Sequence, residues 1–443
     1  MRLLGQADRT GSASLNYLSL ARRNLLRNRR RSLVTLASIA IGVAAIALFA
    51  GYTKAMYRGL RNMAIHGEML GHVSINKAGW YEQGKLQPGK FVITENEFAK
   101  IDGIVREVLP RAILIPRAVL DGLVSNGRSS TIFIAYGIDP RELQVLLGPL
   151  GGVYRGLSAD RSSGVSIADG LGALLGLDIG TEAVVLVSTN SGQANAADIV
   201  VVDRVNTGNT ATNDKFILMP LALVRSLKDI GKGAEWVSLL LQVPPASSSV
   251  DAGIRALFTT ASASDAEVDA AKSALRRRFE AAGLSLEVHG WRDLSIYYNQ
   301  VKRLYDIIFA LLLAIVVTVV ALSVFNAMSM SVVERTREIG TLRAIGLRRS
   351  GVLRLFVAEA LLLAVVGSMV GVGISALAGW LITAADIRYV PPGNSLAIPV
   401  YVSFDLDRTL LALAALAFLA VAAALAAARK AAWRPIVDSL THA

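Results

Sequence analysis

The chain contains no cysteine, and its four histidines (His66, His72, His289 and His442) are widely spread. The lack of cysteine excludes disulfides and thiolate metal sites, but it does not decide the compartment, because a disulfide-free domain of this size can fold in an oxidising space. His66 and His72 lie six residues apart in a glycine-containing stretch, which is not a helical metal-ligand spacing. We therefore expect no metal site and no bound cofactor, and no catalytic triad or carboxylate pair is evident in the sequence.

Charged residues are also scarce. Only 18% of the 443 residues are charged and 53% are hydrophobic, whereas a soluble domain carries about 25% charged residues. A membrane-spanning helix needs about 20 mostly apolar residues. Four stretches meet this length: 33–52, 305–330, 352–382 and 409–428. We predict a membrane protein with four transmembrane α-helices.

The formal net charge of +12 is unevenly distributed. Residues 1–32 hold eight Arg and one Asp, and residues 331–354 hold six Arg and two Glu, whereas residues 53–304 are nearly balanced with 27 bases and 25 acids. Four spans place the strongly basic segments on one side of the membrane, which is the positive-inside pattern. Both termini are therefore expected in the cytoplasm. Because membrane topology accounts for the positive charge, no nucleic-acid partner is expected. The first span, preceded by arginines and followed by no convincing cleavage site, is expected to be an uncleaved signal anchor.

The segments between the spans complete the predicted layout. It comprises a cytoplasmic N-terminal segment (1–32), a large extracytoplasmic α+β domain (53–304), a cytoplasmic stalk and coupling helix (331–351), a short periplasmic loop (383–408) and a cytoplasmic tail (429–443). Within the first segment, residues 15–31 place Leu18, Ala21 and Leu25 on one side of a basic helix. This pattern is typical of a helix lying in the membrane interface.

The domain at 53–304 shows local signals of both helix and strand. Strands are predicted for runs rich in β-branched residues and bounded by Gly, Asn or Pro, at 183–188, 199–205, 215–220 and 236–243. A helix is predicted from Asp265 to about Ala282, because Ser264 and Glu267 form a capping box and Gly283 supplies a stop. The segment PPASSS at 244–249 is the best candidate for a linker between two lobes.

A dense charged turn separates the second and third spans. Residues 331–353 read SVVERTREIGTLRAIGLRRSGVL. A single straight helix would place Leu342 among the charges, so two pieces fit better. We expect the second span to continue as a stalk to Gly340. A short helix at 341–345 would follow, capped by Thr341 and ended by Gly346.

The run VVERTREIGTLRAIG (332–346) resembles the hallmark of the FtsX-like permeases of ABC transporters, which include lipoprotein-releasing permeases and the macrolide exporter. The runs VSIADGLGALLGLDIGTEAVVLVS, VDRVNTGN and FILMPLALVRSL are similar to the outside domain of this family. The resemblance implies a non-catalytic permease of the mechanotransmission class in the bacterial inner membrane. The residues implied to couple it to an ATPase are Glu334, Arg335, Arg337, Glu338, Gly340, Thr341, Leu342, Arg343, Ala344 and Gly346.

The chain contains no G-x-x-x-x-G-K-[ST] motif, so it has no usual cradle for nucleotide phosphates. ATP and magnesium are therefore expected on separate cytoplasmic ATPase subunits. With four helices and one outside domain, a complete transporter is expected to need a second copy or a homologue of this permease. Membrane lipid and a periplasmic adaptor or carrier protein are the other expected partners.

Lipoprotein or lipid-linked cargo is the favoured substrate. Efflux of a small molecule or peptide, and a signalling scaffold that activates a cell-wall hydrolase, are the alternatives. The aromatic pair Trp80 and Tyr81 follows the first span and is a candidate for interface anchoring or cargo contact.

Two features of the third span complete the prediction. Gly367, Gly371, Ser375 and Gly379 recur every four residues and form a ridge for close helix packing, within the chain or across a dimer. Glu359 is expected to form an ion pair with Arg335 or Arg354 rather than a proton or substrate site.

Overall fold

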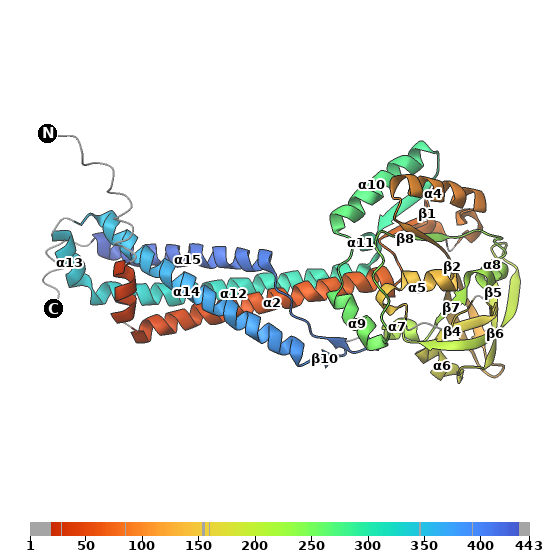
Figure 1. Ribbon diagram of the computed structural model, residues 1–443, viewed down its shortest axis with the longest axis horizontal. Helices are drawn as coiled ribbons and strands as arrows, with labels where there is room; N and C mark the ends of the chain where they lie inside the picture. Colours follow the sequence, from red (N-terminus) through yellow and green to blue (C-terminus); the bar gives the residue numbers. More distant parts are fainter. Residues whose placement is uncertain are drawn as a thin grey trace. The chain divides into compact units, whose positions relative to one another are not determined.

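The computed structural model describes residues 19–27, 29–84, 86–152, 156–158, 160–344, 347–391 and 393–433. The chain forms two compact units (Figure 1). The helix unit comprises Met1–Lys54, Arg303–Asp386 and Tyr401–Ala443, and the sheet unit comprises Ala55–Lys302 and Ile387–Val400. Each unit is described separately below.

Four of the described helices are long and apolar enough to cross a membrane. They are α2 (Arg29–Asn62), α12 (Ile296–Glu334), α14 (Arg349–Ala384) and α15 (Leu406–Trp433). Each contains nearly all of one predicted apolar stretch, but the helices extend further. α2 has 34 residues, a length of about 51 Å at 1.5 Å per residue, whereas the hydrocarbon core is about 30 Å thick.

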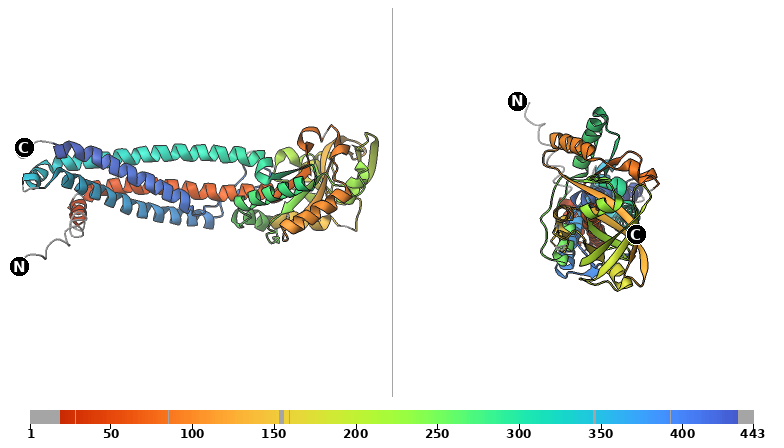
Figure 2. Two further views of the ribbon diagram at one scale, coloured as in Figure 1. Left: turned by 90° about the horizontal axis from the view of Figure 1, so that it is seen from above. Right: turned by 90° about the vertical axis from the view of Figure 1, so that its right-hand side faces the viewer.

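The four helices pack side by side around one apolar core (Figures 1 and 2). Every helix contributes buried residues, for example Ile39 of α2, Val320 of α12, Phe356 of α14 and Ala420 of α15. Residues 19–27 are also helical.

The predicted apolar side of that N-terminal helix packs against the protein. Ala21 is fully buried, and Leu25 packs against the core of the helix unit. Leu18 lies outside the described residues.

The small-residue ridge of α14 packs within the chain. A Cβ atom on Gly367 would lie 2.8 Å from the Ile39 side chain, and one on Gly371 would lie 2.6 Å from the Ala40 carbonyl oxygen. Ser375 is 5% exposed, and a Cβ on Gly379 would meet Val402 at 3.1 Å. Gly367 and Gly371 thus let α14 approach the backbone of α2 closely.

The sheet unit is built on a sheet of nine described strands in the order β3-β7-β4-β6-β5-β2-β8-β1-β9. The strands are β1 (Val73–Lys77), β2 (Ile113–Ser125), β3 (Ser130–Ile138), β4 (Gly164–Ala168), β5 (Glu182–Ser188), β6 (Ala194–Val205), β7 (Phe216–Pro220), β8 (Trp236–Leu240) and β9 (Leu286–Gly290). β5 to β8 overlap the four predicted runs, although β6 begins earlier, at Ala194, and β8 ends earlier, at Leu240. Most pairs are antiparallel, whereas β3 with β7 and β4 with β6 are parallel.

Short helices connect and cover these strands. They are α3 (Trp80–Gln83), α4 (Glu95–Val108), α5 (Pro140–Leu146), α6 (Asp169–Leu175), α7 (Thr210–Asn213), α8 (Leu221–Lys228), α9 (Val250–Thr259), α10 (Asp265–Ala281) and α11 (Trp291–Leu294), with the single turns η1 (Met63–Gly67), η2 (Pro88–Phe91) and η3 (Gly148–Leu150). A small hairpin, β10 (Arg388–Tyr389) and β11 (Ile398–Pro399), belongs to the same unit. α10 has the predicted capping box between Ser264 and Glu267.

The linker at 244–249 does not divide the domain as expected. It follows β8 and leads into α9, and β9, which lies beyond it in the sequence, returns to pair with β1 in the same sheet. The long strand β2 instead joins the two halves of the sheet, because it pairs with β8 at one end and with β3 and β5 at the other.

Candidate functional site

The corner between the second and third spans differs from the prediction. α12 ends at Glu334 and α13 (Thr336–Ala344) begins two residues later, so the stalk does not continue straight to Gly340. The Thr336 hydroxyl donates to the carbonyl oxygens of Val332 and Val333, both at 3.0 Å. This local bond offers the backbone an alternative to regular helix geometry.

The helix that was predicted to couple to an ATPase is therefore longer than expected and begins earlier. Thr341 lies inside α13, and its hydroxyl donates to the Arg337 carbonyl oxygen at 3.0 Å rather than capping the N-terminus. Arg337, Glu338, Thr341 and Ala344 are exposed, Arg343 is half-buried, and Gly340 is buried. The side chain of Leu342 and residue Gly346 lie outside the described part.

A buried ion pair fixes this corner to the third span. Arg335 Nη1 lies 2.8 Å from Glu359 Oε1, and the two side chains are 9% and 2% exposed. Asn24 Nδ2 donates to the same oxygen at 2.6 Å, and Arg335 Nη2 donates to the Asn24 carbonyl oxygen at 3.3 Å. We call Asn24, Arg335 and Glu359 the Glu359 cluster. It joins the N-terminal helix, the break between α12 and α13, and α14.

A cavity of about 20 Å³ adjoins the Glu359 cluster, enough for one water molecule. Around it, two further ion pairs tie the N-terminal segment to the motif. Arg31 forms a bidentate pair with Glu334, both N–O distances being 2.9 Å, and Arg27 Nη2 lies 2.9 Å from Glu338 Oε1. Both motif glutamates are thus engaged by arginines that precede the first span.

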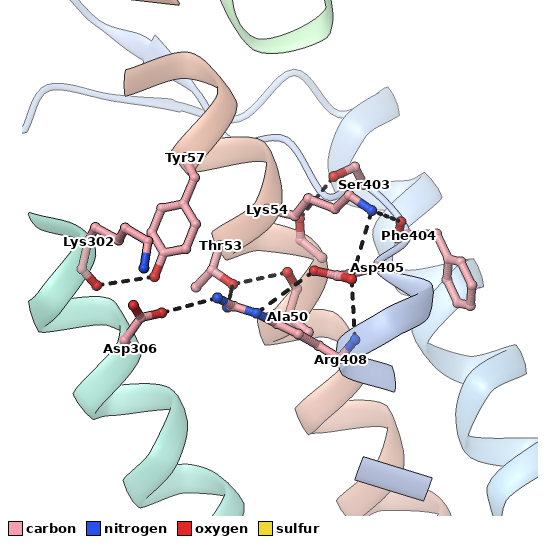
Figure 3. Close-up of polar contacts among 11 residues, drawn as sticks. Ala50, Thr53, Lys54, Tyr57, Lys302, Asp306, Ser403, Phe404, Asp405 and Arg408 are labelled. Carbon is pink, nitrogen blue, oxygen red and sulfur yellow. Dashed lines mark hydrogen bonds and ion pairs between the residues drawn. The ribbon is translucent and has the colours of Figure 1, made fainter. Parts of the chain in front are cut away.

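A second polar cluster joins α2, α12 and α15 (Figure 3). Arg408 of α15 donates to Thr53 Oγ1 of α2 at 2.9 Å and to Asp306 Oδ1 of α12 at 3.1 Å. Lys54 Nζ lies 3.8 Å from Asp405 Oδ1, and Asp405 is also 3.9 Å from Arg408. We call these five residues the Arg408 cluster. No motif in the sequence predicted it.

The two clusters bracket the apolar part of the helix unit. Arg31, which lines the cavity beside the Glu359 cluster, and Thr53 of the Arg408 cluster both lie in α2 and are separated by 22 residues, which corresponds to about 33 Å. This distance is close to the thickness of a bilayer core. Charged residues immediately flanking the apolar runs, such as Lys54 and Asp306, were the signal in the sequence that could have located the second cluster.

The predicted cargo-contact residues lie in the sheet unit. Trp80 and Tyr81 form part of α3, with ring centroids 5.0 Å apart, and both rings contact Trp236 of β8. Tyr81 is 40% exposed. Among the described residues, no group of three or more His, Asp or Glu side chains is placed to hold a metal ion.

Comparison with known families matches residues 308–436 to the family described as FtsX-like permease C-terminal. This range covers most of α12, all of α13 and α14, and α15. The two polar clusters draw their residues both from this range and from the preceding part of the chain.

Two curated relatives illustrate the similarity. The macrolide export ATP-binding/permease protein MacB of Escherichia coli is 32% identical over 104 residues, covering 22% of this chain and 16% of that protein. The pyoverdine export ATP-binding/permease protein PvdT of Pseudomonas fluorescens is 33% identical over 113 residues, covering 24% of this chain and 17% of that protein. The matches thus span less than a fifth of these relatives.

Two solved structures resemble about half of the chain. The periplasmic region of MacB from Actinobacillus actinomycetemcomitans gives a TM-score of 0.31 with 11% identity, covering 50% of this chain and 89% of that chain. The extracellular domain of the transporter YknZ from Gram-positive bacteria gives a TM-score of 0.31 with 13% identity, covering 49% of this chain and 99% of that chain.

Proposed function

We propose that this chain is a multi-pass membrane permease of the FtsX-like type found in ABC transporters, and that it couples ATP hydrolysis by separate cytoplasmic ATPase subunits to movement of its sheet unit. The observation that carries the proposal is the α12–α13 corner, a basic helix held to two other helices by a buried ion pair. ATP and magnesium bind to the partner ATPase in this scheme. Both termini and α13 lie on the cytoplasmic side, and the sheet unit lies on the other side.

The charge and exposure of α13 suit it for docking. Arg337 is exposed on its surface, while Glu334 and Glu338 are engaged by arginines of the N-terminal segment. Pairing the acids within the chain leaves α13 with a net basic surface. A partner cleft with acidic residues would complement that surface and speed association.

The Glu359 cluster would pass force from α13 to the spans. Breaking a buried ion pair leaves a charge without a partner and costs about 3–5 kcal/mol. A push on α13 therefore moves Arg335 and Glu359 together rather than separating them. α14 then transmits the motion to α2, because the glycine ridge packs these two helices with little space between them.

The cargo is proposed to be a lipoprotein or another lipid-linked molecule, released by a dimer of this permease or by a pair with a homologue. The exposed Tyr81 and the neighbouring Trp80 are the proposed contacts for cargo or for the lipid surface. The second candidate is efflux of a small molecule or peptide through a periplasmic adaptor. It is favoured by the names of the relatives, which describe export of macrolides, pyoverdine and syringafactin.

Co-purification tests the coupling proposal. The wild-type chain, extracted in mild detergent, is expected to retain an ATPase subunit that mass spectrometry identifies together with bound lipid. Replacing Arg337→Glu and Arg343→Glu together should abolish that retention, because both changes reverse charge on α13. Arg128→Glu, at an exposed loop of the sheet unit, is the matched control and should retain the ATPase. Undiminished ATPase retention by the double variant would refute the docking role of α13.

A further inference from the structure

Arg117 is a buried arginine of the sheet unit that has no acidic partner among the described residues. It lies in β2 directly opposite Trp236 of β8 and is only 3% exposed. Its Nε atom is enclosed and has no hydrogen-bond partner, and its recorded side-chain contacts are with aromatic rings. Arginine is rarely buried without a paired anion, because desolvating the charge is costly.

Aromatic rings surround the guanidinium group. It lies 4.9 Å from the ring centroid of Trp236 and 5.5 Å from that of Tyr136 in β3. Two further rings pack against Trp236. The Tyr81 ring centroid lies 5.8 Å from that of Trp236, and the Trp80 ring centroid lies 5.3 Å from it. Cation–π contacts of this kind recover part of the cost of desolvating the charge, but they satisfy none of the N–H donors at the edge of the guanidinium group.

The unused polar atoms in this cluster are donors. Trp236 Nε1 is buried and, like Arg117 Nε, has no hydrogen-bond partner. Burial raises the pKa of the Tyr81 phenol, with Arg117 opposing the shift, so its hydroxyl is neutral and can donate. Burial lowers the pKa of Arg117 to about 10, which still leaves it charged at neutral pH.

The nearby carboxylates are already engaged elsewhere. Glu235 precedes Trp236 in the sequence, but its carboxylate accepts from Lys228 Nζ at 2.5 Å and from the Val119 N–H at 3.0 Å. Glu287 accepts from the Gly79 N–H at 2.9 Å and lies 3.1 Å from His289 Nε2. Neither one forms an ion pair with Arg117, so the group that matches this cation is missing from the described part of the chain.

We propose that Arg117, Trp236 and Tyr81 form a binding site for an oxyanion, either a phosphate or a carboxylate group. The edge of a guanidinium group matches both anions in a bidentate geometry, and the indole N–H supplies an additional donor. Tyr81 lies at the exposed side of this site, because it is 40% exposed. The proposal does not depend on the ATPase coupling described above, because it concerns only contacts inside the sheet unit.

Thermal unfolding of the purified full-length chain tests the site. Unfolding is followed in detergent while the concentration of one anion is raised, with ionic strength held constant by chloride. The anions are inorganic phosphate, acetate, and monomeric dihexanoyl phosphatidylglycerol. A ligand that binds only the folded state raises the unfolding midpoint as its concentration rises. A response to phosphate or acetate indicates a free anion or a terminal carboxylate, whereas a response to the lipid alone indicates a lipid headgroup.

Arg117→Met is the decisive variant. We expect its midpoint without ligand to be at or above that of the wild type, because the substitution removes an uncompensated buried charge. It should lose the anion-dependent rise completely, whereas the exposed control Arg128→Met should keep it. A wild-type chain that responds to none of the three anions, or an Arg117→Met variant that responds like the wild type, overturns the proposal.

A second variant tests the site even if Arg117→Met does not fold. Trp236→Phe keeps an aromatic ring over Arg117 and removes only the Nε1 donor. We expect it to fold and to need an anion concentration at least several-fold higher for the same rise in midpoint. An unchanged dose dependence in this variant would contradict the site as drawn.

Discussion

The Glu359 cluster and the Arg408 cluster both connect elements of the helix unit, but they differ in how much water reaches them. Arg335 and Glu359 are 9% and 2% exposed and share an additional donor from Asn24. Arg408 and Asp306 are 25% and 38% exposed, and the Arg408 to Asp405 distance is 3.9 Å. Enclosed pairs are expensive to break, whereas solvated pairs exchange partners at little cost. The end that carries α13 is therefore the rigid one, and rearrangement between helices is expected at the Arg408 end.

The largest expected effect is at the rigid end. Glu359→Leu leaves Arg335 buried without an acidic partner and should lower the free energy of unfolding by about 3–5 kcal/mol. Thermal or denaturant unfolding in detergent measures this loss. The double variant Arg335→Met with Glu359→Leu removes both charges and should recover most of it. A double variant as unstable as the single one would show that the ion pair is not the source of rigidity.

The next largest effect is expected where α14 packs against α2 in the helix unit. Gly371→Ala places a Cβ atom 2.6 Å from the Ala40 carbonyl oxygen and should cost about 1–3 kcal/mol through overpacking. Gly373→Ala is the matched control, because a Cβ at Gly373 meets nothing within 4 Å. The control should be neutral or slightly stabilising, since alanine favours helix more than glycine does. Equal effects in the two variants would argue against close contact between α14 and α2.

The Arg408 cluster should respond more weakly. Arg408→Met is expected to cost about 1 kcal/mol, because its partners remain partly solvated. The same unfolding measurement at low and high salt separates the electrostatic part, which should shrink as salt rises. A loss as large as that of Glu359→Leu would contradict the distinction between the two ends.

The smallest effect is expected for the exposed pair between Arg27 and Glu338, whose side chains are 69% and 49% exposed. Glu338→Gln should change stability by about 0.5 kcal/mol or less. A double-mutant cycle with Arg27→Gln measures the coupling between the two residues. A coupling well above 1 kcal/mol would mean that this pair belongs to the rigid assembly rather than to its rim.

Local sequence signals located the elements better than the contacts between them. The capping box at Ser264 and Glu267 predicted α10, and β-branched runs predicted β5 to β8, because these signals act within a few residues. The break at Arg335 was missed, since no glycine or proline marks it. It coincides with a buried pair to Glu359, 24 residues later in the chain.

Long-range pairing also hid the other sites. Arg408 contacts Thr53, 355 residues away in the sequence, and Asp306, 102 residues away. Local sequence patterns do not predict contacts between residues so far apart. Arg117 lies in a strand that reads as apolar, and only the folded sheet shows that it faces Trp236. The ion pair of Glu359 was predicted correctly because a carboxylate in a spanning helix requires a partner, and Arg335 was one of two available.

Site-specific labelling tests the central claim, which is that α13 and the sheet unit lie on opposite sides of the membrane. The chain has no cysteine, so Arg337→Cys and Arg128→Cys each introduce a unique thiol. With a membrane-impermeant maleimide, Arg128→Cys should be labelled in intact spheroplasts, and Arg337→Cys only in inside-out vesicles. Labelling of both thiols from the same side would contradict the account.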